Sequence, residues 1–213
     1  MFARFQTVAT VPPTDDPDAR RRELTDILRR HAGYSGAYFL VSGPTAMRAL
    51  VTLWSTEEDA RAASDRTRAA QGGGPRPVTL DEDTVYEVTD DEPGAAADGE
   101  PAVVAVAAFD GPFSDAGRAA IDRVHRRQVI PAARAVPGTV RLLVLWDHLS
   151  RSMRALLLAT DAASLRAAHE AVEATDPAAE EDPALVSPPD RVDSWEVAGA
   201  DVPARLTGAS ARP

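Results

Sequence analysis

Eight short segments of the chain are rich in β-branched and apolar residues, and four longer segments carry apolar residues at helical spacing. In the first half these segments predict a strand, a helix, two strands, a helix and a strand, over 1–11, 17–31, 37–41, 47–54, 55–70 and 84–89. The second half repeats this order over 103–109, 114–135, 139–146, 152–160, 162–174 and 191–197. The order βαββαβ is that of a ferredoxin-like unit, so the predicted fold class is α+β with two such units in tandem.

Composition sets the expected domain boundaries. The segment DDEPGAAADGE at 90–100 is acidic, rich in small residues and interrupted by Pro and Gly, which is typical of a linker. We therefore expect a first ferredoxin-like repeat over 1–90, a linker over 91–101 and a second repeat over 102–202. The last residues, 203–213, are expected to form a flexible tail.

Short letter matches support the repeat. Met47–Leu50 recurs as Met153–Leu156, and the pattern at Tyr86–Val88 recurs at Trp195–Val197. Two small units that each expose a sheet are expected to pack together, because a shared core stabilises both. This layout resembles a dimeric α+β barrel fused into one chain. The resemblance implies one compact pseudo-twofold barrel of two four-stranded sheets, with helices outside, the linker outside the barrel, and pockets between sheet and helices.

The helix predicted over 114–135 carries mixed residues on one face. Four residues at helical spacing share that face, two of them polar: Ile121, Val124, His125 and Gln128. Pro131 lacks a backbone N–H, so it either kinks this helix or begins a new turn. One interpretation of His125 is a hydrogen-bonded core histidine. The other is that His125 and Gln128 line a pocket, where the imidazole acts as acid or base near neutral pH.

The pairs Ile130-Pro131 and Pro137-Gly138 precede a predicted strand. Their spacing resembles the EthD-like branch of the dimeric α+β barrel proteins, which carries Glu-His-(Leu/Ile)-Pro and then Pro-Gly at this place. Here Gln128 stands at the family's Glu position and Val129 at its His position. The resemblance thus implies the fold, but it implies histidine chemistry only if His125, one helical turn earlier, takes that role. His125 is the candidate catalytic residue and Gln128 a candidate ligand-binding residue.

Trp54 ends a predicted strand and stands just before the helix start at Ser55–Glu58. This arrangement resembles the antibiotic-biosynthesis monooxygenases, and the resemblance implies that Trp54 borders a ligand pocket. The alternative is a tryptophan that packs at the corner between strand and helix. Those monooxygenases often pair the Trp with an Asn, and this chain contains no Asn, so their mechanism is not carried over.

Period-two alternation places Arg154 on one face of its strand, and the letter match places Arg48 on the equivalent face of the first half. An arginine on a half-buried sheet face can hold a carboxylate or phenolate through charge-assisted hydrogen bonds, or it can pair with a structural acid. Arg154 is therefore a candidate ligand-binding residue. Tyr38, in the strand over 37–41, is another.

Charge and missing residue types exclude several classes of function. The net charge of −10 disfavours binding to nucleic acid or to an anionic membrane. The chain has no Cys and no Lys, which excludes disulfides, thiolate nucleophiles and Schiff-base lysines. No phosphate loop and no metal-ligand spacing is found, so we expect no metal, no flavin and no other cofactor. The absence of a signal-like start and of a long apolar run predicts a soluble, cytoplasmic protein.

Three functional hypotheses follow. The first is a cofactor-independent oxygenase or cyclase that acts on an aromatic, polyketide-type metabolite. The second is a non-catalytic binding or scaffold protein with a degenerate active site. A weaker third is a heme-binding variant, in which His31, His125 or His148 would ligate iron. The expected partner is a small hydrophobic or aromatic molecule, and the expected state is a monomer with an internal pseudo-dimer, with further homo-oligomerisation left open.

Overall fold

The computed structural model describes residues 1–8, 16–42, 48–71, 80–175 and 181–202. Some expectations concern residues outside these ranges. They are the end of the first strand at 9–11, the turn residues 43 and 44, the loop at 72–77, part of the loop at 176–189 and the tail at 203–213.

The predicted element order is confirmed in both halves. The first half contains β1(Phe2–Val8), α1(Pro17–Arg29), β2(Tyr34–Val41), β3(Arg48–Trp54), α2(Glu57–Gln71) and β4(Leu80–Pro93). The second half contains β5(Val103–Phe109), α3(Asp115–Val124), the π-helical turn η1(His125–Val129), α4(Ile130–Arg134), β6(Thr139–Asp147), β7(Ser152–Ala159), α5(Ala162–Glu173) and β8(Arg191–Asp201).

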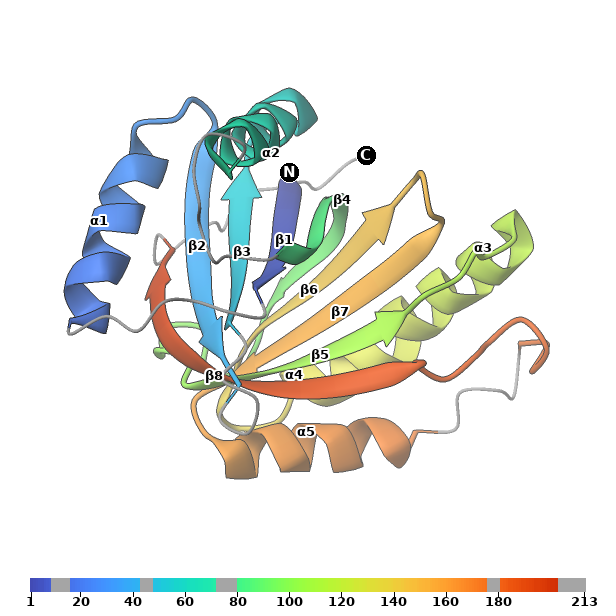
Figure 1. Cartoon of the computed structure of the whole chain (residues 1–213). Coiled ribbons are helices and arrows are strands. Elements are labelled where there is room, and N and C mark those ends of the chain that lie inside the picture. Colours follow the sequence, from blue (N-terminus) through green and yellow to red (C-terminus); the bar gives the residue numbers. More distant parts are fainter. Residues whose placement is uncertain (9–15, 43–47, 72–79, 176–180, 203–213) are drawn as a thin grey trace.

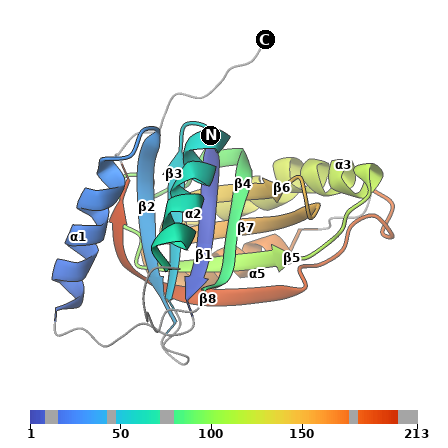
Figure 2. The same ribbon diagram turned by 45° about the horizontal axis from the view of Figure 1, so that its top comes forward.

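The strands of the described residues form one closed antiparallel barrel, in the order β1-β3-β2-β8-β5-β7-β6-β4. Each half contributes four neighbouring strands in the ferredoxin-like order, β4-β1-β3-β2 and β8-β5-β7-β6. The halves join where β2 pairs with β8 and where β4 pairs with β6. The helices lie outside, α1 and α2 against the first half and α3 to α5 along the second (Figures 1 and 2). The predicted fused barrel is therefore the observed fold.

The expected linker begins later than the sequence suggested, because residues 90–93 belong to β4. The acidic side chains of this stretch pair with arginines of the second half: Asp90 with Arg126, Asp91 with Arg141, and Glu92 with Arg134. Beyond the strand, the Gly94 N–H donates to the Val140 carbonyl, and a Cβ on Gly94 would lie 2.1 Å from the Thr139 carbonyl oxygen. An acidic, proline-bearing run resembles a linker in composition, yet here its charges are compensated and its backbone completes the seam with β6.

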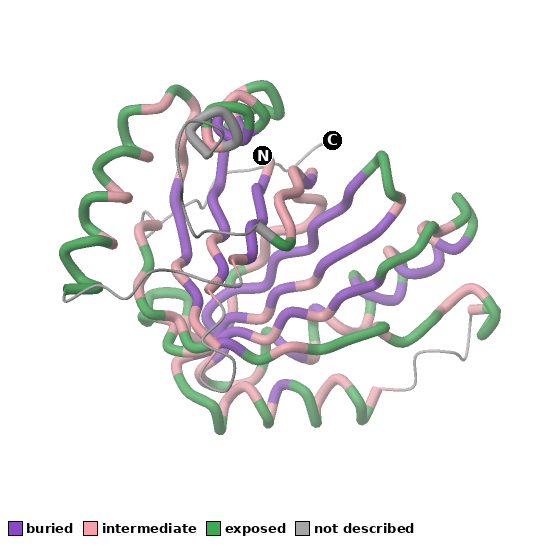
Figure 3. Tube along the Cα trace, viewed as in Figure 1, coloured by how far each residue is buried: buried purple, intermediate pink, exposed green. Residues whose placement is uncertain are grey.

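The main core fills the barrel interior, and it draws apolar side chains from strands of both halves. Figure 3 shows the buried stretches of these strands. A second cluster lies between α3, α4, α5 and the outer face of the second half. The outer face of the first half has a smaller apolar cluster around Trp54. Beside it, a buried ion pair joins Arg4 Nε to Asp83 Oδ1 at 2.7 Å, with the two side chains 3% and 8% exposed. Polar contacts thus make up a larger share of the packing between α2 and the sheet in the first half than between the helices and the sheet in the second half.

The helix predicted over 114–135 is continuous from its N-cap at Ser114, whose Oγ accepts from the Gly117 N–H at 3.0 Å. Pro131 cannot donate a backbone hydrogen bond, and the helix widens into a π-helical turn just before it. The Ile130 N–H donates to the carbonyl of His125, five residues earlier. Pro131 then lies in the first turn of α4.

One of the two letter matches is out of structural register. Ala49, Val51 and Leu53 of β3 point into the barrel, so Arg48 points outward with Trp54. Arg154 shares its face with Leu156 and Leu158, which are interior. A slip of one residue turns a side chain to the opposite face, so the expected equivalence of Arg48 and Arg154 is wrong. The second match is in register, because Tyr86 and Trp195 both point inward.

None of the described helices is long and apolar enough to cross a membrane.

Candidate functional site: a cavity at the mouth of the barrel

One end of the barrel interior opens into a cavity of about 670 Å³, which we call the barrel-mouth cavity. Both halves contribute to it, because corresponding strand ends of the two repeats meet there: the ends of β1, β2, β5 and β6, and the starts of β4, β7 and β8. Its apolar wall is formed by Phe5, Tyr86, Val106 and Trp195. Tyr86 and Trp195 occupy matching places in the two repeats, so the repeat itself supplies two facing aromatic residues.

Polar residues line the rest of the cavity. Five carboxylates contribute, from Asp81, Glu82, Asp110, Asp147 and Asp193, together with the guanidinium groups of Arg154 and Arg191. Hydroxyl groups come from Thr7, Ser42, Thr84, Ser150, Ser152 and Ser194, in addition to Tyr86. Most of these residues stand at or just beyond strand ends, where the apolar core of the barrel has ended.

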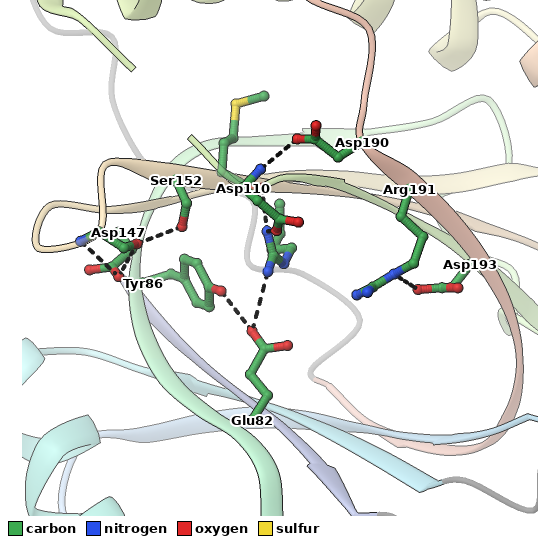
Figure 4. A network of polar contacts seen from close by, with 11 residues as sticks. Glu82, Tyr86, Asp110, Asp147, Ser152, Asp190, Arg191 and Asp193 are labelled. Atoms are coloured by element: carbon green, nitrogen blue, oxygen red, sulfur yellow. Dashed lines mark hydrogen bonds and ion pairs between the residues drawn. The ribbon is translucent and has the colours of Figure 1, made fainter. Parts of the chain in front are cut away.

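Arg154 is the centre of one polar network. Its Nη1 lies 3.0 Å from Asp110 Oδ1, and its Nη2 lies 3.9 Å from Glu82 Oε1. The Tyr86 hydroxyl donates to the same Glu82 oxygen at 2.7 Å (Figure 4). Burial is the main cause that raises the pKa of the Tyr86 phenol far above its ordinary value, so the hydroxyl stays protonated and remains a donor.

The neighbouring polar groups are also held in place. Asp147 accepts from the Leu149 N–H at 2.9 Å and from the Ser150 hydroxyl at 2.5 Å. Arg191 Nε lies 2.6 Å from Asp193 Oδ2 (Figure 4). Such mutual support orients the wall before any ligand arrives.

Trp195 differs from these residues. It is 6% exposed and lines the cavity, yet its indole Nε1 has no hydrogen-bond partner among the described residues. A buried donor without an acceptor costs about 1–3 kcal/mol. This atom has almost no accessible surface, so a molecule in the cavity would contact the ring of Trp195 rather than its N–H.

The sequence-based candidates are spread over the molecule. Arg154 lines the barrel-mouth cavity as a ligand-binding residue should. The other four candidates, His125, Gln128, Trp54 and Tyr38, do not line it.

His125 lies between its helix and the outer face of the sheet, 7% exposed, with its ring 6.0 Å from that of Phe109. The prediction that this helical face meets the sheet is therefore confirmed. Its Nδ1 and the Gln128 Oε1 are buried without a partner among the described residues. Burial lowers the pKa of His125 to about 4, with a small opposing effect of Asp90. The ring is neutral at pH 7, and a pKa of about 4 is far from the value that suits acid–base catalysis at neutral pH.

Trp54 is fully buried beneath α2, and its Nε1 donates to Thr52 Oγ1 at 2.8 Å. Its ring meets Tyr34 edge-on at 5.7 Å. This is the packing alternative for Trp54 on the outer face of the sheet.

Tyr38 points into the barrel, but away from the cavity. Its hydroxyl accepts from Arg141 Nη1 at 2.9 Å, and Arg141 also pairs with both oxygens of Asp91, at 2.6 and 2.7 Å. Arg141 lies six residues before Asp147 in the same strand, and only Asp147 of the two lines the cavity. Tyr38 therefore belongs to a polar cluster that joins the two halves deep in the barrel.

The three histidines considered for iron lie in separate places. His31 packs near Trp54, with ring centroids 6.4 Å apart, whereas His148 is exposed and lies 2.7 Å from Glu87. In the part of the chain that the structure describes, no group of three or more His, Cys, Asp or Glu side chains is arranged to hold a metal ion.

No protein-family model matches the sequence, and no curated protein matches it. Solved structures do match the fold. A protein predicted to be a monooxygenase, from Fusobacterium nucleatum, has a TM-score of 0.61 at 8% identity, over 94% of each chain. An anthrone oxidase-like protein has a TM-score of 0.54 at 13% identity, over 93% of this chain and 92% of that one. A monooxygenase-like protein from Listeria innocua has a TM-score of 0.51 at 10% identity, over 92% and 94%.

The fold is that of the dimeric α+β barrel proteins. The short motifs that resemble EthD-like proteins and antibiotic-biosynthesis monooxygenases therefore indicated this fold correctly. In this fused barrel, the cavity is lined by residues that the motifs did not point to, namely Glu82, Tyr86, Asp110 and Trp195. The recurrence of an aromatic residue at Tyr86 and Trp195 was the one sequence signal for any of them.

Proposed function

We propose that this chain binds a small molecule with a planar aromatic body in the barrel-mouth cavity. The observation that carries this proposal is the aromatic ring of Trp195 in the wall of a cavity large enough for a small ligand. Tyr86 and Phe5 supply further aromatic surface in the same wall. A non-catalytic binding role fits the cavity best, because its carboxylates and guanidiniums are largely engaged with one another.

Binding can be tested with 5-methoxytryptophol, a neutral bicyclic alcohol. Isothermal titration at pH 7 is expected to show one site. Thr84 lines the cavity, so Thr84→Trp places a bulky side chain in it and should weaken binding strongly. Trp146 is buried outside the cavity, so Trp146→Phe is the matched control and should bind as wild type does. Unchanged binding by Thr84→Trp would place the ligand elsewhere.

A catalytic role, as a cofactor-independent oxygenase or cyclase of an aromatic metabolite, is the second candidate. The observation in its favour is the contact of the Tyr86 hydroxyl with Glu82 beside Arg154, which sets a proton donor and a carboxylate in the cavity wall. With anthrone as substrate, oxygenation would consume one O₂ and form one anthraquinone and one water. Oxygen uptake that is lost in Tyr86→Phe and Glu82→Gln would support it. The catalytic role predicted for His125 stays a prediction, and His125 is not among the described residues that line this cavity.

A further inference from the structure

The wall of the barrel-mouth cavity carries more negative than positive formal charge. Among the described residues, five carboxylates face two guanidinium groups, a formal difference of −3. Arg154 is shared between Asp110 and Glu82, and Arg191 is engaged by Asp193. Both described cations of the wall are thus paired with acids of the same wall. A cationic group on a ligand would complement the remaining negative charge.

The positions of the charges and the aromatic rings are complementary. The carboxylates of Asp81, Glu82 and Asp193 come from the outer ends of β4 and β8, whereas Tyr86 and Trp195 lie further along the same strands. A ligand whose cationic end meets the carboxylates would place its apolar body against the aromatic rings. Aromatic faces also attract cations, which adds to the same preference.

We propose that the ligand of this cavity is an aromatic amine: a planar body that bears an ammonium group. The ammonium group binds at the acidic rim, and the planar body lies against the rings of Tyr86 and Trp195. Two observations therefore lead to one ligand class, the charge excess and the aromatic wall. This inference rests on the proposed function, since it names the class of ligand for the same site. It also disfavours anionic phenolates and carboxylates, which the acidic wall repels.

Three compounds of nearly equal shape separate the alternatives: 5-methoxytryptamine, a cation, 5-methoxytryptophol, which is neutral, and 5-methoxyindole-3-acetate, an anion. Isothermal titration of the full chain at pH 7 and low salt is expected to show the amine binding about tenfold more tightly than the alcohol, since a charge-assisted hydrogen bond is stronger than a neutral one. The acid should bind more weakly than the alcohol. Raising the salt concentration should narrow these differences in affinity, because dissolved ions screen solvent-exposed charges. The screening length is about 10 Å at 0.1 M salt and shortens as salt is added.

The double variant Glu82→Gln/Asp110→Asn removes two carboxylates of the wall and leaves Arg154 unpaired. The preference for the amine over the alcohol should fall to about twofold or less, with the alcohol still bound, which also shows that the variant is folded. Asp18→Asn/Glu23→Gln is the matched control, because it removes two exposed carboxylates of α1 and changes the net charge equally. The control should keep the full preference.

The two proposals fail in different ways. If the alcohol or the acid binds wild-type protein as tightly as the amine, the ligand class is wrong while the binding cavity stands. If none of the three compounds binds, the proposed function fails and the ligand class with it. If the double variant does not fold, the comparison of the three compounds on wild-type protein still decides.

Discussion

Two single residues with a buried, unpaired polar atom lie in different settings, and the setting decides the role of each residue. The ring of Trp195 lines an open cavity, where a ligand can contact it. His125 is packed against Phe109 between helix and sheet, away from that cavity. Trp195 therefore indicates a binding surface, whereas His125 indicates a constraint on stability.

Protonation of His125 should make the fold sensitive to acid. The folded pKa is about 4, below the ordinary 6.5, so between these values the unfolded chain binds more protons and stability falls as pH falls. From pH 7 to pH 4.5 this residue should cost roughly 2–3 kcal/mol of unfolding free energy, at 1.36 kcal/mol per pH unit. Urea denaturation at the two pH values measures it. His125→Leu should lose that part of the dependence, whereas His169→Leu, at an exposed site, should keep it. Parallel pH profiles for wild type and His125→Leu would contradict this assignment.

Among the elements, α1 is attached in an unusual way. It has no buried residue, and polar contacts hold it to the last strand of the other half. Arg29 pairs with Asp201 of β8 at 2.6 Å, the Tyr34 hydroxyl donates to the same carboxylate at 2.9 Å, and Arg21 donates to the Ala198 carbonyl. Helix α1 thereby covers the seam between β2 and β8. Leu28 packs against the Trp54 cluster, and the remaining contacts of the helix named here are charged or hydrogen-bonded.

Asp201→Asn should therefore loosen α1 without unfolding the barrel. Hydrogen exchange of the amides over 17–29 should become about two- to fivefold faster, the range that an exposed ion pair supports. Glu173→Gln, which removes an exposed carboxylate of α5, should leave the exchange of the α1 amides unchanged.

Lowering the pH should act on α1 in the same direction as Asp201→Asn. Hydrogen bonding by Arg29 lowers the pKa of Asp201, so its contribution is present above the ordinary Asp range and is lost as pH falls through the lowered value. Equal exchange in Asp201→Asn and wild type would show that other contacts hold the helix.

At the scale of the whole molecule, local patterns were enough for the fold but not for the site. Periodicity and the repeated order predict two ferredoxin-like units, because strands and helices are specified by nearby residues. Barrel closure then brings together strand ends that are distant in sequence, such as Glu82 and Arg154, and no local motif reports that proximity. The equivalence of Arg48 and Arg154 failed because a slip of one residue reverses the face of a strand. The acidic run at 90–93 was misread because its arginine partners lie in the second half.

The central claim is that a small molecule binds beside Trp195 at the barrel mouth, and the indole N–H signals of ¹⁵N-labelled protein test it most directly. The chain has three tryptophans, so three indole signals are expected, and the one lost in Trp195→Phe belongs to Trp195. On titration with 5-methoxytryptamine, the Trp195 signal should move and saturate at one equivalent bound. The signals of Trp54 and Trp146, which lie outside the cavity, should stay in place. A Trp195 signal that does not move while the amine binds, or a saturable shift of Trp54 or Trp146 in its place, would contradict the claim.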